Sequence, residues 1–158
     1  MEQLSLFDEP VTLDDGLPQI DLKALYAYAK EQAQLHWQRE FDIEIELVDR
    51  KWSATGGMYI HNTETGRNWI RMSKVMNKAR TWEQVQATLL HELVHWHMHT
   101  SGLPYRDDDV EFAMECLRVG AKISGTKIAQ HTARVAQALG ERMALINSAE
   151  GRQESLFR

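Results

Sequence analysis

Residues 91 to 99 read HELVHWHMH, a segment that places four histidines and one glutamate within nine positions. Ordinary packing rarely requires so many imidazoles in one place. His91 and His95 are four residues apart, so a helix puts both side chains on one face, about 6 Å apart along its axis. Two rings placed in this way can converge on one ion. Glu92 lies about 100° further around the helix, where its carboxylate can reach a water molecule on that ion.

This HExxH spacing predicts a zinc site with hydrolytic chemistry. Zinc acts as a Lewis acid and lowers the pKa of a water molecule that it binds. A carboxylate beside that water can take its proton and deliver it to the leaving amine of a cleaved peptide bond. We therefore predict Zn²⁺ as the cofactor, His91 and His95 as metal ligands, and Glu92 as the catalytic general base.

The remaining two histidines of the segment are predicted not to bind the metal. His97 lies about 200° around the helix from His95, and His99 lies about 12 Å along the axis from His91. A third ligand is therefore expected after Gly102, in a segment whose acidic residues could also stabilise the start of the next helix. The candidates in this segment are Asp107, Asp108, Asp109, Glu111 and Glu115.

Hydrophobic periodicity predicts a helix followed by a small sheet. Apolar residues recur every three or four positions from about Asp21, the expected N-cap, to Glu40. Alternating apolar and polar residues then predict strands at 41–48, 56–62 and 68–73, with a turn before the last. We expect a three-stranded, mostly antiparallel sheet.

Three further helices complete the predicted α+β fold. Thr81, with Gln84 three residues later, predicts the start of a helix that carries the histidines and ends at about Thr100. Two more helices are expected at about 108–119, with Phe112, Cys116 and Val119 on one face, and at about 126–147.

Length and composition indicate one soluble domain. The 158 residues suit a single folded unit, expected at 20–148, with flexible tails at 1–19 and 149–158. No apolar run approaches the roughly 20 residues that span a membrane, so no membrane partner is expected. The start of the chain lacks the features of a secretory signal, and the single cysteine cannot form an internal disulfide. We expect a cytoplasmic location, with association with the nucleoid where DNA is bound.

Charge is unevenly distributed along the chain. The first 50 residues contain 12 acidic and 4 basic side chains, a balance of −8, whereas the remainder has 11 acidic and 14 basic, a balance of +3. Two stretches contain basic residues and no acidic ones, which is compatible either with a phosphate-contacting surface for DNA or with solvated cationic faces. The first stretch holds Arg67, Arg71, Lys74, Lys78 and Arg80, and the second holds Arg118, Lys122, Lys127 and Arg134.

The part of the chain from about Trp52 to Gly120 resembles the SprT-like (Spartan-type) zinc metalloprotease domain, which has a zincin-like fold. The resemblance rests on four segments. Gly56-Gly57 match a glycine-bearing strand, and residues 70–73, IRMS, match a strand written like I-R-L-S. Residues 88–95, TLLHELVH, match the helix with the HExxH, and residues 108–112, DDVEF, match the H-G-P-E-F that opens the next helix.

The resemblance also implies a third ligand. In the family, a histidine ligand lies four residues before the phenylalanine of the last segment, which is Phe112 here, and this position is Asp108. ImmA/IrrE metalloproteases place an acidic ligand at the same distance. From the residues alone, Glu111 and Glu115 are also possible third ligands. Glu115 follows His95 at the spacing seen in thermolysin-like sites. This sequence departs from the family in having an acid in place of the histidine and no cysteine-rich zinc ribbon.

The two ends of the chain carry similar pentapeptides, QLSLF and QESLF. The first resembles the short peptide by which many bacterial proteins bind the replicative sliding clamp. In such binding, an extended peptide inserts apolar side chains into a pocket while its glutamine forms a hydrogen bond at the rim. Two such tethers would raise the effective concentration of the protein on DNA. The predicted clamp-binding residues are Gln3, Leu4, Leu6, Phe7, Gln153, Leu156 and Phe157.

These observations predict a zinc-dependent endopeptidase that cleaves DNA-associated or DNA-crosslinked proteins and is recruited by the sliding clamp. A substrate is expected to pair, in extended conformation, with the edge of the strand at 69–72. One alternative is a regulatory metallopeptidase of the ImmA/IrrE kind that cleaves a repressor. Another is a non-enzymatic metal-containing binding module, although structural zinc sites usually have four protein ligands.

Overall fold

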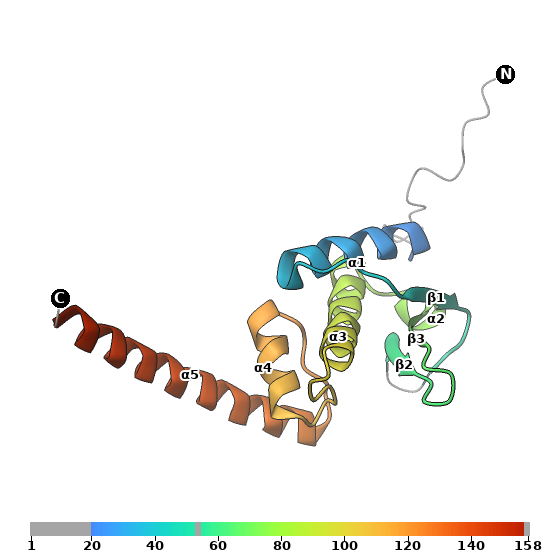
Figure 1. The fold of residues 1–158 in the computed structure, drawn as a ribbon. Coiled ribbons are helices and arrows are strands. Elements are labelled where there is room, and N and C mark those ends of the chain that lie inside the picture. Colours follow the sequence, from blue (N-terminus) through green and yellow to red (C-terminus); the bar gives the residue numbers. More distant parts are fainter. Residues whose placement is uncertain (1–19, 53–54, 157–158) are drawn as a thin grey trace. The chain divides into compact units, whose positions relative to one another are not determined.

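The computed structural model describes residues 20–52 and 55–156. The predicted tail at 1–19, with its clamp-binding residues, and Phe157 lie outside the described residues. The chain divides into two compact units, Met1–Trp96 and His97–Arg158, each of which is described by itself. In chain order the elements are α1 (Leu22–Trp37), β1 (Glu44–Val48), β2 (Gly57–His61), β3 (Asn68–Ser73), α2 (Lys74–Asn77), α3 (Trp82–Thr100), α4 (Val110–Val119) and α5 (Lys127–Leu156) (Figure 1).

These elements form a mixed α+β fold, as predicted. Helix α1 begins where the sequence indicates, because the carboxylate of Asp21 accepts hydrogen bonds from the second and third main-chain amides that follow it. The helix ends at Trp37 rather than Glu40, because Gln38 adopts the left-handed conformation, with φ of 49°. The residues of α1 that are buried are Leu25, Ala29, Ala33 and Trp37.

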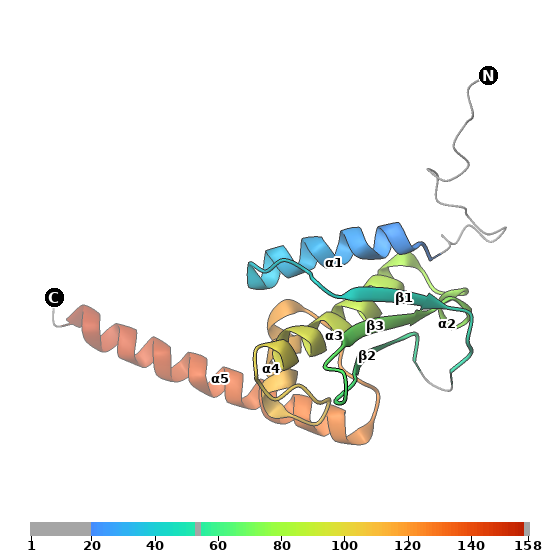
Figure 2. The same cartoon turned by 45° about the vertical axis from the view of Figure 1, so that its right-hand side comes forward.

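The three strands lie in the order β1-β3-β2 (Figure 2). Strand β2 is antiparallel to β3, whereas β1 is parallel to β3. The prediction of a mostly antiparallel sheet is therefore wrong for one of the two pairings. An antiparallel sheet is expected when strands that follow one another in the sequence are also neighbours in the sheet. A short turn joins β2 to β3 and requires them to be antiparallel, but β1 pairs on the far side of β3.

This strand order also changes which strand lies at the edge. Residues 69–72, expected to offer an edge to a substrate, belong to β3, which has a neighbouring strand on each side. The outer strands of the described sheet are β1 and β2. An extended polypeptide could therefore pair with β2 rather than with β3.

Helix α3 begins with the predicted capping interaction. The amide of Gln84 donates to Thr81 Oγ1 at 3.2 Å, and the amide of Thr81 donates to Gln84 Oε1 at 3.0 Å. This reciprocal pair satisfies two main-chain donors at the helix start. The apolar side chains of α3 that are buried are Val85, Leu89, Leu90, Leu93, Val94, Trp96 and Met98.

An aromatic cluster holds α3 in the first unit. The ring of Trp96, which is fully buried, lies 6.1 Å from the ring of Trp37 and 5.3 Å from the ring of Phe41. Its indole Nε1 donates to Asp42 at 3.3 Å, and the guanidinium of Arg39 lies 4.3 Å from the ring centroid. Because both polar and apolar contacts hold this ring, the rotation of α3 about its axis is fixed one residue after His95.

In the second unit, helix α4 packs against the first part of α5. Phe112, Cys116 and Val119, predicted to share one face of α4, are all buried, and Gly120 ends the helix in the left-handed conformation, with φ of 75°. Such a φ favours glycine because it has no Cβ. The predicted end of this helix is therefore confirmed.

Helix α5 continues well beyond its packed part. Ala129, Thr132 and Ala136 are buried, but every residue from Gln137 to Gln153 is exposed. The predicted helix end at 147 is wrong, because α5 continues to Leu156 through a part that contains no proline and mostly good helix formers. Although α5 has 30 residues, neither it nor another described helix is long and apolar enough to cross a bilayer.

These burial patterns predict where truncation of a leucine destabilises the protein. Leu89 on α3 is 0% exposed, so Leu89→Ala should lower the free energy of unfolding by about 3 kcal/mol, through lost apolar burial and a residual cavity. Leu145 on α5 is 71% exposed, so Leu145→Ala should change it by less than about 0.5 kcal/mol. Urea unfolding followed by circular dichroism measures both, and equal losses would contradict the described core.

Candidate metal centre

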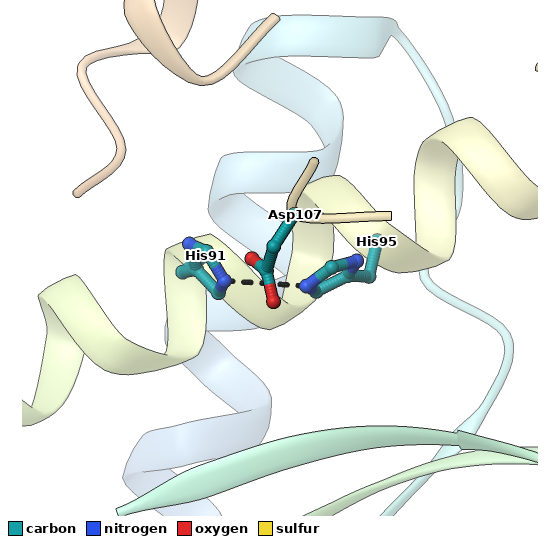
Figure 3. Close-up of side chains that lie close together, drawn as sticks. All are labelled: His91, His95 and Asp107. Atoms are coloured by element: carbon teal, nitrogen blue, oxygen red, sulfur yellow. Dashed lines mark hydrogen bonds between the residues drawn. The ribbon is translucent and has the colours of Figure 1, made fainter. Parts of the chain in front are cut away.

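Helix α3 brings His91 and His95 together as their spacing requires. Their Nε2 atoms lie 3.2 Å apart (Figure 3), and the ring planes are inclined by 81° with centroids 4.9 Å apart. His91 is 6% exposed and His95 is half-buried. Two imidazole nitrogens this close to each other, on partly dehydrated rings, are well placed to share one cation.

Glu92 lies beside this pair but outside the group of possible ligands. Its side chain is 5% exposed, and its Oε2 accepts a hydrogen bond of 2.8 Å from the main-chain amide of Tyr59 in β2. A buried carboxylate requires such a donor, because its charge loses hydration on burial. The carboxylate is thus held at one oxygen by β2.

Tyr59, which was not among the predicted site residues, makes a second contact at this place. Its ring is nearly parallel to the imidazole of His95, at 8° and a centroid distance of 6.4 Å. The alternation of β2 places residues 57 and 59 on one face, but nothing in the sequence spacing indicates that this face meets α3. Strand β2 therefore contacts both Glu92 and His95.

An acidic side chain joins the two histidines. His91, His95 and Asp107 each offer one ligand atom, and these atoms all lie within 4.8 Å of one another (Figure 3). Oδ1 of Asp107 is buried. Two imidazole nitrogens and one carboxylate oxygen form a donor set that suits zinc. The group could therefore hold a metal ion.

The acid in this group is Asp107 and not Asp108, which the family resemblance implied. Asp108 is exposed, and its main-chain carbonyl accepts a hydrogen bond from Thr132 at 3.4 Å. Counting back from Phe112 assumes one regular backbone across the segment. Helix α4, however, begins only at Val110, so helical spacing from Phe112 does not determine the side-chain positions of the loop residues before it.

The other candidate ligands also lie outside the group. Glu115 forms hydrogen bonds of 3.0 Å with Arg118 on the same helix, and Glu111 is exposed. The ring of His99 lies 4.3 Å from the ring of Tyr105. Neither His99 nor His97 belongs to the group found among the described residues.

Part of the predicted basic surface is neutralised by neighbouring acids. Arg67 pairs with Glu44 at 2.7 Å, and Arg71 pairs with Glu46 at 2.8 Å, in both cases between β1 and the β3 side of the sheet. Both guanidinium groups also lie over the ring of Trp69, at 4.4 and 5.9 Å from its centroid. These contacts reduce the charge available to phosphate groups at this face.

Comparison with known proteins identifies the family of this chain. A sequence model of the SprT-like family matches residues 23–132, which is more than half of the chain. The chain belongs to the SprT-like family. It is 28% identical over 105 residues to Protein SprT-like of Bacillus subtilis (strain 168), and the match covers 65% of this chain and 65% of that protein. The matched region thus spans slightly less than two thirds of the relative's length.

Metal loading of single variants can identify the ligands. His91→Ala and Asp107→Asn should each weaken zinc binding by more than about tenfold, because each removes a donor atom. Asp108→Asn and His97→Ala are the matched controls, and both should bind zinc as the unmodified protein does. Competition with a chromogenic chelator measures the affinities. Weaker zinc binding by Asp108→Asn, with normal binding by Asp107→Asn, would show that Asp108 is the third ligand, as the family resemblance implies.

Proposed function

We propose that this protein is a zinc-dependent endopeptidase with a zincin-like fold. The observation that carries the proposal is the arrangement on α3, where two histidine Nε2 atoms lie 3.2 Å apart and Glu92, the residue after His91, has a buried side chain. Three protein ligands are typical of catalytic zinc sites, which leave a position open, whereas structural sites usually have four. The three-residue group therefore favours a catalytic site over a non-enzymatic binding module.

The residues of this chain would divide the chemistry as follows. When bound, Zn²⁺ supplies Lewis acidity and lowers the pKa of water. His91, His95 and Asp107 would hold the ion. Glu92 would take the proton of the attacking water and pass it to the leaving nitrogen of the peptide bond. The hydrogen bond from Tyr59 to Oε2 would leave the other carboxylate oxygen of Glu92 to accept that proton.

The substrate would be an extended polypeptide. Strand β2 is an outer strand of the described sheet, and its residue Tyr59 contacts both Glu92 and His95. A polypeptide that adds to a sheet edge forms main-chain hydrogen bonds that do not depend on sequence. This mode of binding suits an enzyme that accepts many different proteins.

We further propose that the substrates are proteins bound or crosslinked to DNA. The exposed Lys74 and Lys78 belong to a stretch without acidic residues, and the sliding-clamp-like peptides at the two ends would bring the enzyme to replicating DNA. The site of action would then be the cytoplasm, at the nucleoid. An ImmA/IrrE-like peptidase would instead cleave a single repressor in the absence of DNA.

The catalytic role of Glu92 is tested by a substitution that keeps its shape. Glu92→Gln should bind zinc normally and lower the rate of cleavage of a DNA-crosslinked protein by about 10²- to 10⁴-fold, because the amide cannot accept the proton. Glu83→Gln, at an exposed position on the same helix, should cleave at the normal rate. Assays with and without DNA separate the two peptidase hypotheses, and normal cleavage by Glu92→Gln would remove this residue from the mechanism.

Clamp recruitment is tested with substitutions at the two ends. Replacing Leu6 and Phe7, together with Leu156 and Phe157, by alanine should abolish capture of the protein by immobilised sliding clamp, because the apolar anchors are lost. Leu145→Ala, on the exposed surface of α5, should leave capture unchanged. Helix α5 runs to Leu156, so binding of the C-terminal peptide in extended form would require its last turn to unwind. Capture of the fourfold variant would refute the assignment.

A further inference from the structure

Strand β2 approaches α3 more closely than a strand with a side chain at every position could. A Cβ atom at Gly57 would lie 2.6 Å from Met72 Sδ, 3.0 Å from Thr88 Cγ2 and 3.5 Å from Glu92 Cγ. Met72 and Thr88 are both fully buried, so neither can move easily into solvent. The close approach of the strand to the helix therefore depends on glycine at this position.

The start of β2 is also fixed from its other side. The side chain of Asn77, which is 2% exposed, donates from Nδ2 to the carbonyl oxygens of Gly56 at 2.8 Å and Ser73 at 2.7 Å. A Cβ atom at Gly56 would lie 2.6 Å from Asn77 Oδ1 and from Arg80 Nη1. Two consecutive glycines thus allow β2 to pack tightly between α2 and α3.

The result of this packing is a donor aimed at Glu92. Two residues after Gly57, the main-chain amide of Tyr59 reaches Glu92 Oε2 at 2.8 Å. The Tyr59 ring lies nearly parallel to the imidazole of His95. A main-chain amide cannot rotate away as a side chain can, so its position is set by the position of the strand itself.

We propose that β2 is a positioning strand for the reaction, in which Gly57 and Asn77 set the distance that allows the Tyr59 amide to orient Glu92. The proposal rests on the proposed function in one respect, namely that Glu92 is the general base. Gly57 and Asn77 act through Glu92 and touch no substrate. Because proton transfer depends steeply on geometry, a displacement of about 1 Å at Glu92 can cost on the order of 10²-fold in rate.

The contact itself is tested without any activity measurement. In ¹⁵N-labelled full-length protein, Glu92→Ala should increase the hydrogen-exchange rate of the Tyr59 amide at least about tenfold, because its acceptor is lost. In Glu92→Gln, which keeps a neutral acceptor, the Tyr59 amide proton should shift upfield with a smaller change in exchange. An unchanged shift and exchange rate for Tyr59 in Glu92→Ala would overturn the proposal, whether or not the protein is a peptidase.

The positioning role is tested by kinetics. Gly57→Ala should lower kcat by about 10²-fold while KM changes less than twofold and zinc content stays at the normal level. Gly125→Ala is the matched control, because a Cβ there meets open space, and its kcat should not change. Unchanged kcat in Gly57→Ala, or a loss of zinc parallel to the loss of kcat, would overturn the positioning role.

A second variant keeps the test decisive if Gly57→Ala does not fold. Asn77→Ala removes the hydrogen bond to the carbonyl of Gly56, directly before β2, together with the one to Ser73 at the end of β3. It should give the same pattern, with lower kcat, normal KM and normal zinc content. Failure of the proposed function is recognised separately, because the unmodified protein would then cleave no substrate while the Tyr59 amide still responds to Glu92→Ala.

Discussion

The burial of α3 is the constraint on which the candidate site depends. Trp96 and the buried leucines before it bind one side of this helix to the core, and the helical period then fixes where the interleaved residues His91, Glu92 and His95 point. The ring of Trp96 directly follows His95 in the chain and is enclosed by aromatic neighbours. The direction of the two imidazoles is therefore set by apolar packing, before any metal ion contributes.

Local patterns in the sequence predicted the parts of the fold that are governed by local forces. The capping pair at Thr81 and Gln84, the N-cap at Asp21 and the buried face of α4 depend on residues within one or two helical turns, and the structure contains all of them. The parallel pairing of β1 with β3 could not be predicted in the same way. It depends on contacts between segments more than 20 residues apart, for which a single sequence carries no local signal.

The same distinction applies to the candidate site. The spacing of His91 and His95 predicts that their side chains lie close together, because both residues are on one helix. Asp107 lies in a loop before α4, where the number of residues to Phe112 does not determine the position of a side chain. The contact between Tyr59 and Glu92 joins a strand to a helix 33 residues later. The region that matches the SprT-like family, residues 23–132, includes both of these segments, and the tight packing at Gly57 gives a physical reason for a glycine in the strand that faces the histidine helix.

Helix α5 has a geometric consequence for whatever binds its end. Twenty residues separate Ala136, its last buried position, from Leu156, and at 1.5 Å per residue they extend about 30 Å. A flexible segment of this length would let a bound partner sample a broad range of separations, but a helix holds it at a nearly constant one. The C-terminal segment would thus act as a molecular ruler, keeping any partner bound at its end at a nearly fixed distance from α4.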